Sequence, residues 1–196
     1  MKNNFKFNPQ TLVVISLIIL ASLSRFIPHM YNFSPIGAIS LFGAAFFKNK
    51  WKAFLIPICA TWMSDLFLNN LIYSEYYSGF TWFYEGSHWQ FFSYVLIILL
   101  GVSLYKNNIN LSKLGFGAIG STVIFFMVSN FGVWFSGLIY TKDFAGLVSC
   151  YLAGIPFIKG TALGNLFYVP LLFGSYYLMG IRFPILRKTN GHLTQA

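Results

Sequence analysis

Charged residues are scarce in this sequence, and acidic residues are the scarcest. Of 196 residues, 9% are charged, and Lys and Arg number 13 against 4 Asp and Glu. A soluble domain carries about 25% charged residues, so this composition excludes an ordinary soluble domain. Cysteine is rare too. The two cysteines, Cys59 and Cys150, exclude a disulfide framework, and we expect them to lie too far apart to pair.

Motifs of enzymes and metal sites are also missing. The chain contains no HExxH, no GxSxG and no carboxylate pair at a fixed spacing, so we expect no enzyme. His29 and His88 have no Cys or His neighbours at metal-ligand spacing, so we expect no metal and no cofactor. The basic residues lie beside apolar stretches and do not cluster, so the net charge of +9 predicts contact with anionic lipid and not with nucleic acid.

Apolar residues make up 57% of the chain and fall into six long stretches. A helix needs about 20 residues to cross the hydrocarbon core of a membrane. We therefore predict an all-α membrane protein with a single domain, residues 1–196, and short polar tails at 1–10 and 188–196. The six predicted transmembrane helices are 12–26, 35–47, 53–72, 91–105, 114–140 and 161–181.

The basic residues predict the orientation of these helices. With six spans, the connections alternate between two sides of the membrane, and ten of the Lys and Arg residues fall on one side against three on the other. Loops rich in Lys and Arg stay in the cytoplasm, so we expect both termini to be cytoplasmic and the protein to reside in the cytoplasmic membrane. The three basic residues on the outer side are Arg25, Lys142 and Lys159.

Asp65 is the acidic residue that falls inside a predicted span. A charged side chain at the centre of a membrane costs about 2.5–3.5 kcal/mol on insertion scales, so Asp65 needs a reason to be there. Helical spacing puts Thr61, Asp65 and Asn69 on one face, and Arg25 is a plausible partner for an ion pair. Two interpretations remain open: Asp65 belongs to a ligand site, or it bonds an adjacent helix or loop and is structural.

Other candidate residues lie toward the outer side. Residues 28–35 contain two prolines and several polar groups, which predicts an irregular, buried segment next to a cavity. The long connection 73–90 is rich in Tyr and Trp, which suits a membrane interface or the wall of a small-molecule pocket; we favour the pocket. Residues 142–160 contain a possible short amphipathic helix. The candidate binding residues are Arg25, His29, Asn32, Asp65, Asn69, Trp82, Tyr84, His88, Trp89, Asn130, Trp134, Tyr151, Asn165 and Tyr168.

Several motifs resemble a known family. The run RFIPHMYNFSPIGAISLFGAAFF, from Arg25 to Phe47, and the later pieces MSDLFL, NFGVW, YLAGIPF and GNLFY resemble an uncharacterised family of small bacterial transport proteins. That family in turn resembles the substrate-binding (S) components of energy-coupling-factor (ECF) vitamin transporters. The resemblance implies a six-helix bundle, a ligand pocket near the outer face roofed by loops, and uptake of a vitamin-like compound such as a corrinoid.

The resemblance and the residues together lead to one expected function and two alternatives. We expect a membrane protein that binds a vitamin-like small molecule from outside and transports it. The first span, VVISLIILASLSRF, has no Ala-x-x-x-Ala for docking a coupling subunit, so association with an energising module is left open. The alternatives are a membrane subunit or scaffold that binds another protein without transporting, and an intramembrane enzyme.

Overall fold

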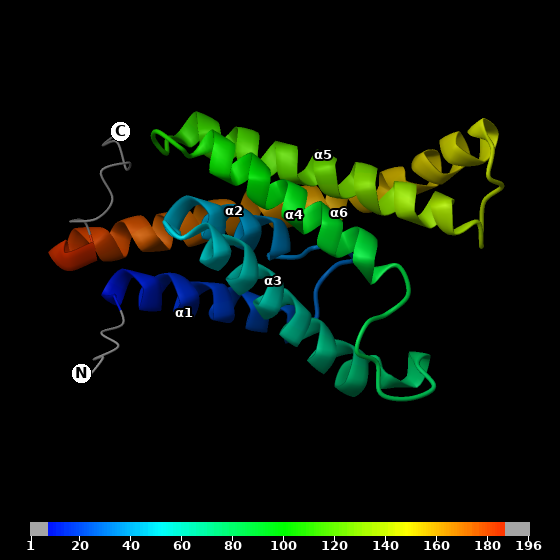
Figure 1. Cartoon of the computed structure of the whole chain (residues 1–196), viewed down its shortest axis with the longest axis horizontal. Helices are drawn as coiled ribbons and strands as arrows, with labels where there is room; N and C mark the ends of the chain where they lie inside the picture. The colour runs from blue at the N-terminus through cyan, green and yellow to red at the C-terminus, as the bar shows by residue number, and fades with distance from the viewer. Residues whose placement is uncertain (1–7, 187–196) are drawn as a thin grey trace.

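The computed structural model describes residues 8–186, and its elements within that range are helices. Six are α-helices, and short 3-10 or π-helical turns extend α1, α3 and α6. Figure 1 shows these helices side by side, with their connections alternating between the two ends of the bundle. The α-helices are α1 (Pro9–Leu23), α2 (Ile36–Phe46), α3 (Lys50–Phe67), α4 (Ser87–Leu104), α5 (Leu111–Ser136) and α6 (Phe144–Arg182).

Four of these helices begin at an Asn or Asp whose side chain accepts from a backbone N–H of the first turn. The four cap residues are Asn8, Asn49, Asn110 and Asp143. Such N-caps satisfy donors that have no partner inside the helix, and each stabilises the helix by about 1 kcal/mol. α5 ends at Gly137, whose φ of 69° lies in the left-handed region that glycine adopts without strain. Local sequence signals therefore mark five of the twelve ends of these helices.

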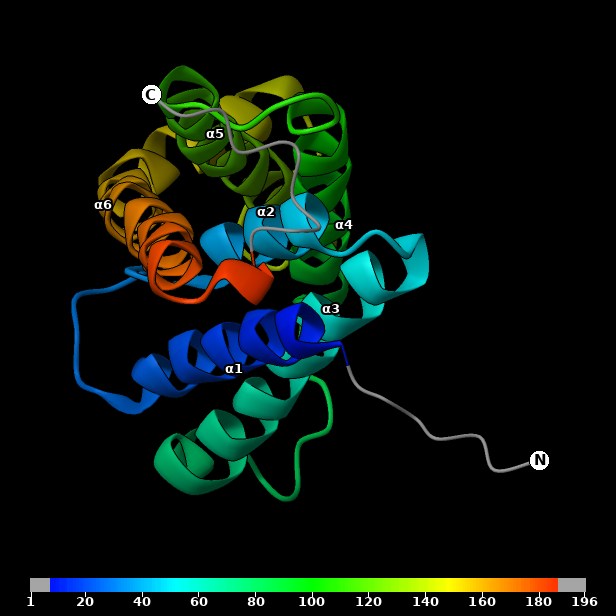
Figure 2. The same ribbon diagram turned by 90° about the vertical axis from the view of Figure 1, so that its left-hand side faces the viewer.

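The short helix α2 lies in the middle of the bundle. Figure 2 shows α1 and α3 on one side of it and α5 and α6 on the other, and most of its residues are buried. Near the end of α2, Phe42 and Phe46 pack against Phe173 and Tyr176 of α6, with ring centroids 4.2–5.9 Å apart. This aromatic cluster closes the bundle toward the end where α1 begins and α6 finishes.

Among residues 8–186, five helices are long and apolar enough to cross a membrane, and α2 is too short to do so alone. At 1.5 Å per residue, its 11 residues span about 17 Å of a core of about 30 Å. For residues 8–186 the structure therefore confirms an all-helical fold with helices long and apolar enough to span a membrane. Six crossings and cytoplasmic termini stay predictions. Lys48 and Lys106 lie in connections at one end of the bundle, and Arg25 and Lys142 lie in connections at the other. Lys2, Lys6, Arg187 and Lys188 fall outside the described residues.

Two local predictions need correction. The short amphipathic helix expected at 142–160 is the first part of α6, which continues without interruption for 39 residues. Pro156 lies inside this helix, and Figure 1 shows that α6 bends near its start. A proline removes one helical hydrogen bond and can bend a helix without ending it. The segment 27–35 is irregular as predicted, but its first half is exposed and not buried; Tyr31 is 87% exposed.

Neither cysteine is in a disulfide. Cys59 is exposed on α3, and Cys150 is buried on α6, where its thiol donates to the backbone oxygen of Asn130 at 3.3 Å. The expectation that they do not pair is confirmed.

Candidate functional site

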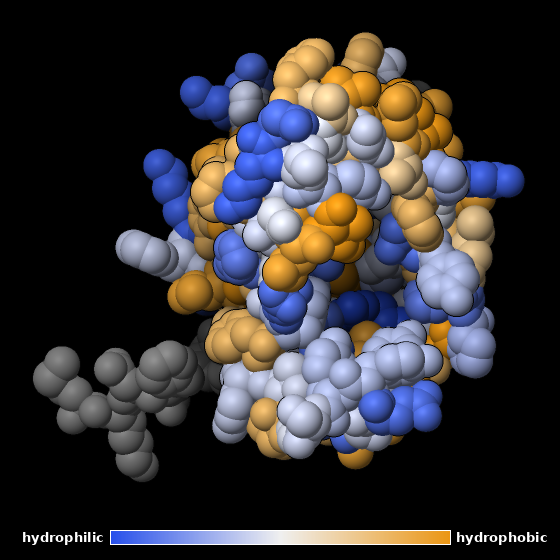
Figure 3. All heavy atoms as spheres, turned by 90° about the vertical axis from the view of Figure 1, so that its right-hand side faces the viewer, coloured by the Kyte–Doolittle hydropathy of each residue, from blue (hydrophilic) through white to orange (hydrophobic). Residues whose placement is uncertain are grey.

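A cavity of about 400 Å³ opens at the end of the bundle opposite the aromatic cluster. Figure 3 looks into this end and shows a hollow between two groups of elements, with hydrophilic atoms deep inside it. The segment before α2, the connection between α3 and α4, and helices α3 to α6 all contribute to its wall. The polar and aromatic lining residues include Arg25, His29, Asn32, Ser34, Asp65, Asn69, Tyr73, Tyr77, Tyr84, Gln90, Tyr94, Ser121, Phe125, Thr161 and Asn165.

An ion pair between Arg25 and Asp65 forms one side of the cavity. The Nη2 atom of Arg25 donates to Oδ1 of Asp65 at 2.6 Å, and its Nη1 atom donates to the Ser64 hydroxyl and to the Thr61 backbone oxygen. Asp65 is 6% exposed, and a buried charge needs such a partner. The structure thus confirms Arg25 as the ion-pair partner of Asp65, and the pair ties the end of α1 to α3.

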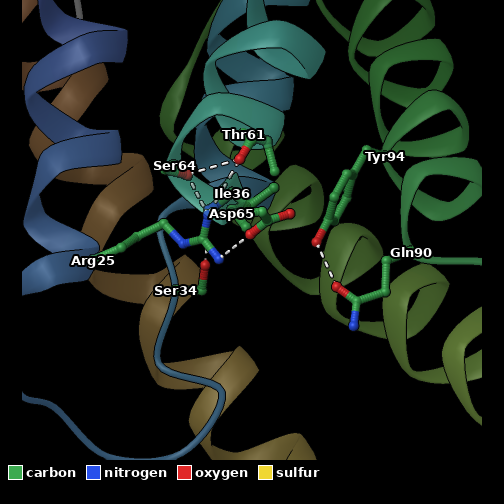
Figure 4. Close-up of polar contacts among 8 residues, drawn as sticks. All are labelled: Arg25, Ser34, Ile36, Thr61, Ser64, Asp65, Gln90 and Tyr94. Atoms are coloured by element: carbon green, nitrogen blue, oxygen red, sulfur yellow. Dashed lines mark hydrogen bonds and ion pairs between the residues drawn. The ribbon is translucent and has the colours of Figure 1, made fainter. Parts of the chain in front are cut away.

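The guanidinium of Arg25 and the carboxylate of Asp65 are oriented differently relative to the cavity. In Figure 4 the guanidinium of Arg25 lies along α3, where Thr61, Ser64 and Asp65 receive its hydrogen bonds. The second carboxylate oxygen of Asp65 points away from Arg25, toward the side where Tyr94 lies. The arginine is therefore turned toward protein groups, whereas the carboxylate keeps one acceptor on the cavity side.

Asn165 of α6 lies at the bottom of the cavity and is 1% exposed. Its Nδ2 atom donates to the Thr122 hydroxyl at 2.9 Å, and that hydroxyl donates in turn to the Ala118 backbone oxygen at 2.9 Å. Within the described part of the chain, the Oδ1 atom of Asn165 has no hydrogen-bond partner. It packs against Gly37 of α2, where any Cβ atom would overlap it. A buried acceptor without a partner is unusual in proteins and invites an explanation.

Tyrosines supply much of the remaining wall. Tyr94 of α4 donates from its hydroxyl to Oε1 of Gln90 at 3.0 Å, and its ring is parallel to that of Phe125 at a centroid distance of 6.1 Å. In the connection before α4, burial and, to a lesser extent, the nearby Asp65 carboxylate raise the pKa of Tyr77 and of Tyr84. Both phenols therefore stay uncharged at neutral pH and keep a proton that they can donate.

Two glycines of α6 allow the irregular segment to form another wall. A Cβ atom at Gly160 would overlap the Tyr31 backbone oxygen, and one at Gly164 would lie 2.8 Å from the Ser34 backbone nitrogen. Small residues four apart let the backbone approach a helix closely. Asn32 has a φ of 59°, a conformation that Asn tolerates better than most residues. The segment before α2 therefore packs closely against α6, and its polar side chains line the cavity.

Half of the predicted binding residues line the cavity together. They come from the segment before α2, from α3 and its π-helical end, from the connection before α4, and from α6. The seven are Arg25, His29, Asn32, Asp65, Asn69, Tyr84 and Asn165.

The other seven predicted residues do not line the cavity. Trp82 is 59% exposed. Its backbone oxygen accepts a hydrogen bond from the indole N–H of Trp62, and the two indole rings are stacked. This part of the loop therefore lies against the flank of α3 and not over the cavity. Trp89 packs against Gly132 of α5 with His88 beside it. Tyr168 bonds the Ser24 hydroxyl at 2.8 Å. Asn130, Trp134 and Tyr151 bond backbone oxygens within the hairpin formed by α5 and α6.

Sequence reasoning missed Gln90, Tyr94, Ser121 and Thr161 as lining residues. One signal was available: Gln90 and Tyr94 are four residues apart, which puts them on the same face of a helix. Ser121 and Thr161 resemble ordinary small residues of membrane helices, which serve packing, so nothing in their spacing separates them. Among residues 8–186, no three His, Cys, Asp or Glu side chains are grouped so as to hold a metal ion.

The length and apolar composition of five helices in the described range indicate a multi-pass helical membrane protein. Comparison with protein families then gives a narrower result. The chain belongs to DUF6580, a family of unknown function whose sequence profile matches residues 5–186. Comparisons with curated proteins and with solved structures found no match.

Proposed function

We propose that this protein binds a small molecule at the outer face of the cytoplasmic membrane and transports it inward. The observation that carries the proposal is the cavity of about 400 Å³. Polar side chains from four α-helices and two connecting segments converge in it, at one end of a bundle of apolar helices. Pockets of about 300–1,000 Å³ with a few convergent polar groups are typical small-molecule sites.

Charge supports the proposed direction. The cavity opens among the connections at 24–35 and 68–86, whereas Lys48, Lys50, Lys52 and Lys106 are at the opposite end of the bundle. Under the rule that basic loops stay in the cytoplasm, the cavity faces outward. A membrane scaffold that binds another protein has no use for a cavity buried among its helices, which favours transport over that alternative.

The volume of the cavity limits the size of the ligand. The cavity of about 400 Å³ is in the range of typical small-molecule sites, so the proposal favours a vitamin-like compound of modest size over a bulky corrinoid. Inward passage also requires movement, because Phe42 and Phe46 of α2 and their partners Phe173 and Tyr176 fill the bundle on the inner side of the cavity. We propose that α2 shifts during transport; coupling to an energising module is one means of driving that shift.

Depletion of compounds from a defined medium tests the proposal. Cells that express the protein should remove at least one small molecule faster than cells that express Asp65→Ala at the same level in the membrane. Asp143→Asn is the control, because Asp143 is an exposed carboxylate outside the cavity and Asn keeps the N-cap of α6; it should deplete the medium like the wild type. Equal depletion by wild type and Asp65→Ala, across a vitamin panel that includes a corrinoid, would refute transport through this cavity.

A further inference from the structure

The lining of the cavity is electrically balanced. Among the described residues that form it, the side chains with a full charge are Arg25 and Asp65, which pair with each other; His29 is exposed at the rim. The guanidinium also bonds Ser64 and Thr61 of α3. An anionic ligand would have to take Arg25 from these partners, and a cationic ligand would compete with Arg25 for Asp65. Moving an unpaired charge from water into an apolar protein interior is strongly unfavourable, so the pair selects against both.

The walls suit a flat ring. The parallel Tyr94 and Phe125 rings come from neighbouring helices and both line the cavity. Tyr73, Tyr77 and Tyr84 line it from the connection between α3 and α4. Aromatic side chains bind planar rings through offset stacking and edge contacts, which contribute about 0.5–1.5 kcal/mol beyond burial of their area.

Two acceptors in the wall have no donor among residues 8–186. Oδ1 of Asn165 is buried and has no hydrogen-bond partner. The second carboxylate oxygen of Asp65 points away from Arg25 and to the cavity side. A buried acceptor that stays unpaired, as Oδ1 of Asn165 does, destabilises the structure by about 1–3 kcal/mol, and the second Asp65 oxygen is open to a ligand. A donor on the ligand would relieve that cost, whereas a ligand that presents only acceptors would not.

We propose that the ligand is an uncharged planar heterocycle of about two or three fused rings, whose N–H group donates to Asp65 while its ring lies against the tyrosines. This inference rests on the proposed function and specifies the substrate class of the same site. It assigns separate tasks to the lining: the Arg25–Asp65 pair excludes net charge, the tyrosines select flat rings, and the free oxygen of Asp65 selects a donor.

A matched set of two-ring probes tests each task. Quinolinone is uncharged and has one N–H, N-methylquinolinone lacks that N–H, quinoline carboxylate is an anion, and N-methylquinolinium is a cation. Adenine and phenanthridinone extend the set of uncharged N–H compounds. Each is titrated into the full-length protein in lipid nanodiscs at pH 7.5, and binding is measured by calorimetry. We expect at least one uncharged N–H probe to bind. Quinolinone should bind about tenfold or more tightly than N-methylquinolinone, which corresponds to loss of one hydrogen bond to a charged acceptor. It should also bind about tenfold or more tightly than the two ions, whose charge would stay unpaired in the cavity.

Two variants separate charge selection from folding. Asp65→Asn leaves Arg25 with a net positive charge, so the preference should shift from quinolinone to quinoline carboxylate. The double variant Arg25→Gln with Asp65→Asn is uncharged again, and it should prefer quinolinone over both ions even if the single variant does not fold. Asp143→Asn makes the same chemical change outside the cavity and should keep the preference of the wild type.

The outcomes distinguish this inference from the proposed function. Tighter binding of the anion or the cation by the wild type would overturn the uncharged class while leaving a small-molecule site in place. Equal binding of quinolinone and N-methylquinolinone would overturn the donor to Asp65. Failure of every probe to bind would overturn the proposed ligand class. The proposed transport function would be refuted as well only if wild-type cells and Asp65→Ala cells also depleted the medium equally.

Discussion

The Arg25–Asp65 pair allows a quantitative test of how the cavity wall is held together. The perturbation is a double-mutant cycle with Arg25→Gln and Asp65→Asn, which remove the charges and keep similar side-chain sizes. Nη2 of Arg25 and Oδ1 of Asp65 are 2.6 Å apart. If the charge centres are about 4 Å apart, the attraction is about 4 kcal/mol at an effective dielectric constant of about 20. Removing one partner of a buried pair typically costs about 3–5 kcal/mol, because the other charge is left alone.

Each single variant should therefore lower the free energy of unfolding by about 3–5 kcal/mol, and the double variant by about 2 kcal/mol or less. The assay is equilibrium unfolding of the purified protein in mixed micelles titrated with SDS. Asp143→Asn is the control. It should change stability by a few tenths of a kcal/mol, because Asn and Asp are comparable N-caps. Single-variant effects that add up in the double variant within about 0.5 kcal/mol would refute the claim that these two charges depend on each other.

Three further predictions concern the cavity and the topology. Tyr84→Phe should weaken binding of the transported compound about tenfold if its hydroxyl contacts the ligand, whereas Tyr76→Phe, on the same connection but 74% exposed and outside the cavity, should bind like the wild type; equal affinities would remove Tyr84 from the site. Gly37→Ala should displace Asn165 and lower the free energy of unfolding by about 1–3 kcal/mol, whereas Gly174→Ala, which has open space around it, should be neutral or stabilising; the check is SDS unfolding. In cells, a thiol reagent that does not cross membranes should label a cysteine placed at Tyr140 and not one placed at Lys106, with Cys59 and Cys150 replaced; the reverse pattern would invert the topology.

The sequence alone predicts the helices well because their ends carry local signals. Asn and Asp caps and Gly137 mark several boundaries, and apolar content identifies the spans. The bounds of α6 were missed because Pro156 and Gly160 are typical of helix ends, yet both lie inside this helix. Packing decides the outcome there: Gly154 contacts Asn130 of α5, and Gly160 contacts the segment before α2. Such contacts join residues far apart in the chain and have no local signature.

The same limit explains which site residues could be predicted. Arg25, Asp65 and Asn165 stand out because polar groups in apolar spans are costly and need a reason. Trp82 and Trp89 also stand out by type, yet they pack on the outer flank of α3 and on α5, and residue type does not show which way a long loop folds. Tyr94 joins the cavity through its place on α4 opposite Asp65, which depends on how the helices assemble.

Native mass spectrometry of the protein extracted from its own membranes tests the central claim most directly, because that claim is that the cavity holds a small molecule. Wild-type protein should carry a bound compound small enough for a cavity of about 400 Å³. The compound should be absent from Asp65→Ala and present in Asp143→Asn, which keeps the N-cap of α6. A wild-type spectrum without any added mass, or an added mass that Asp65→Ala retains in full, would contradict the account.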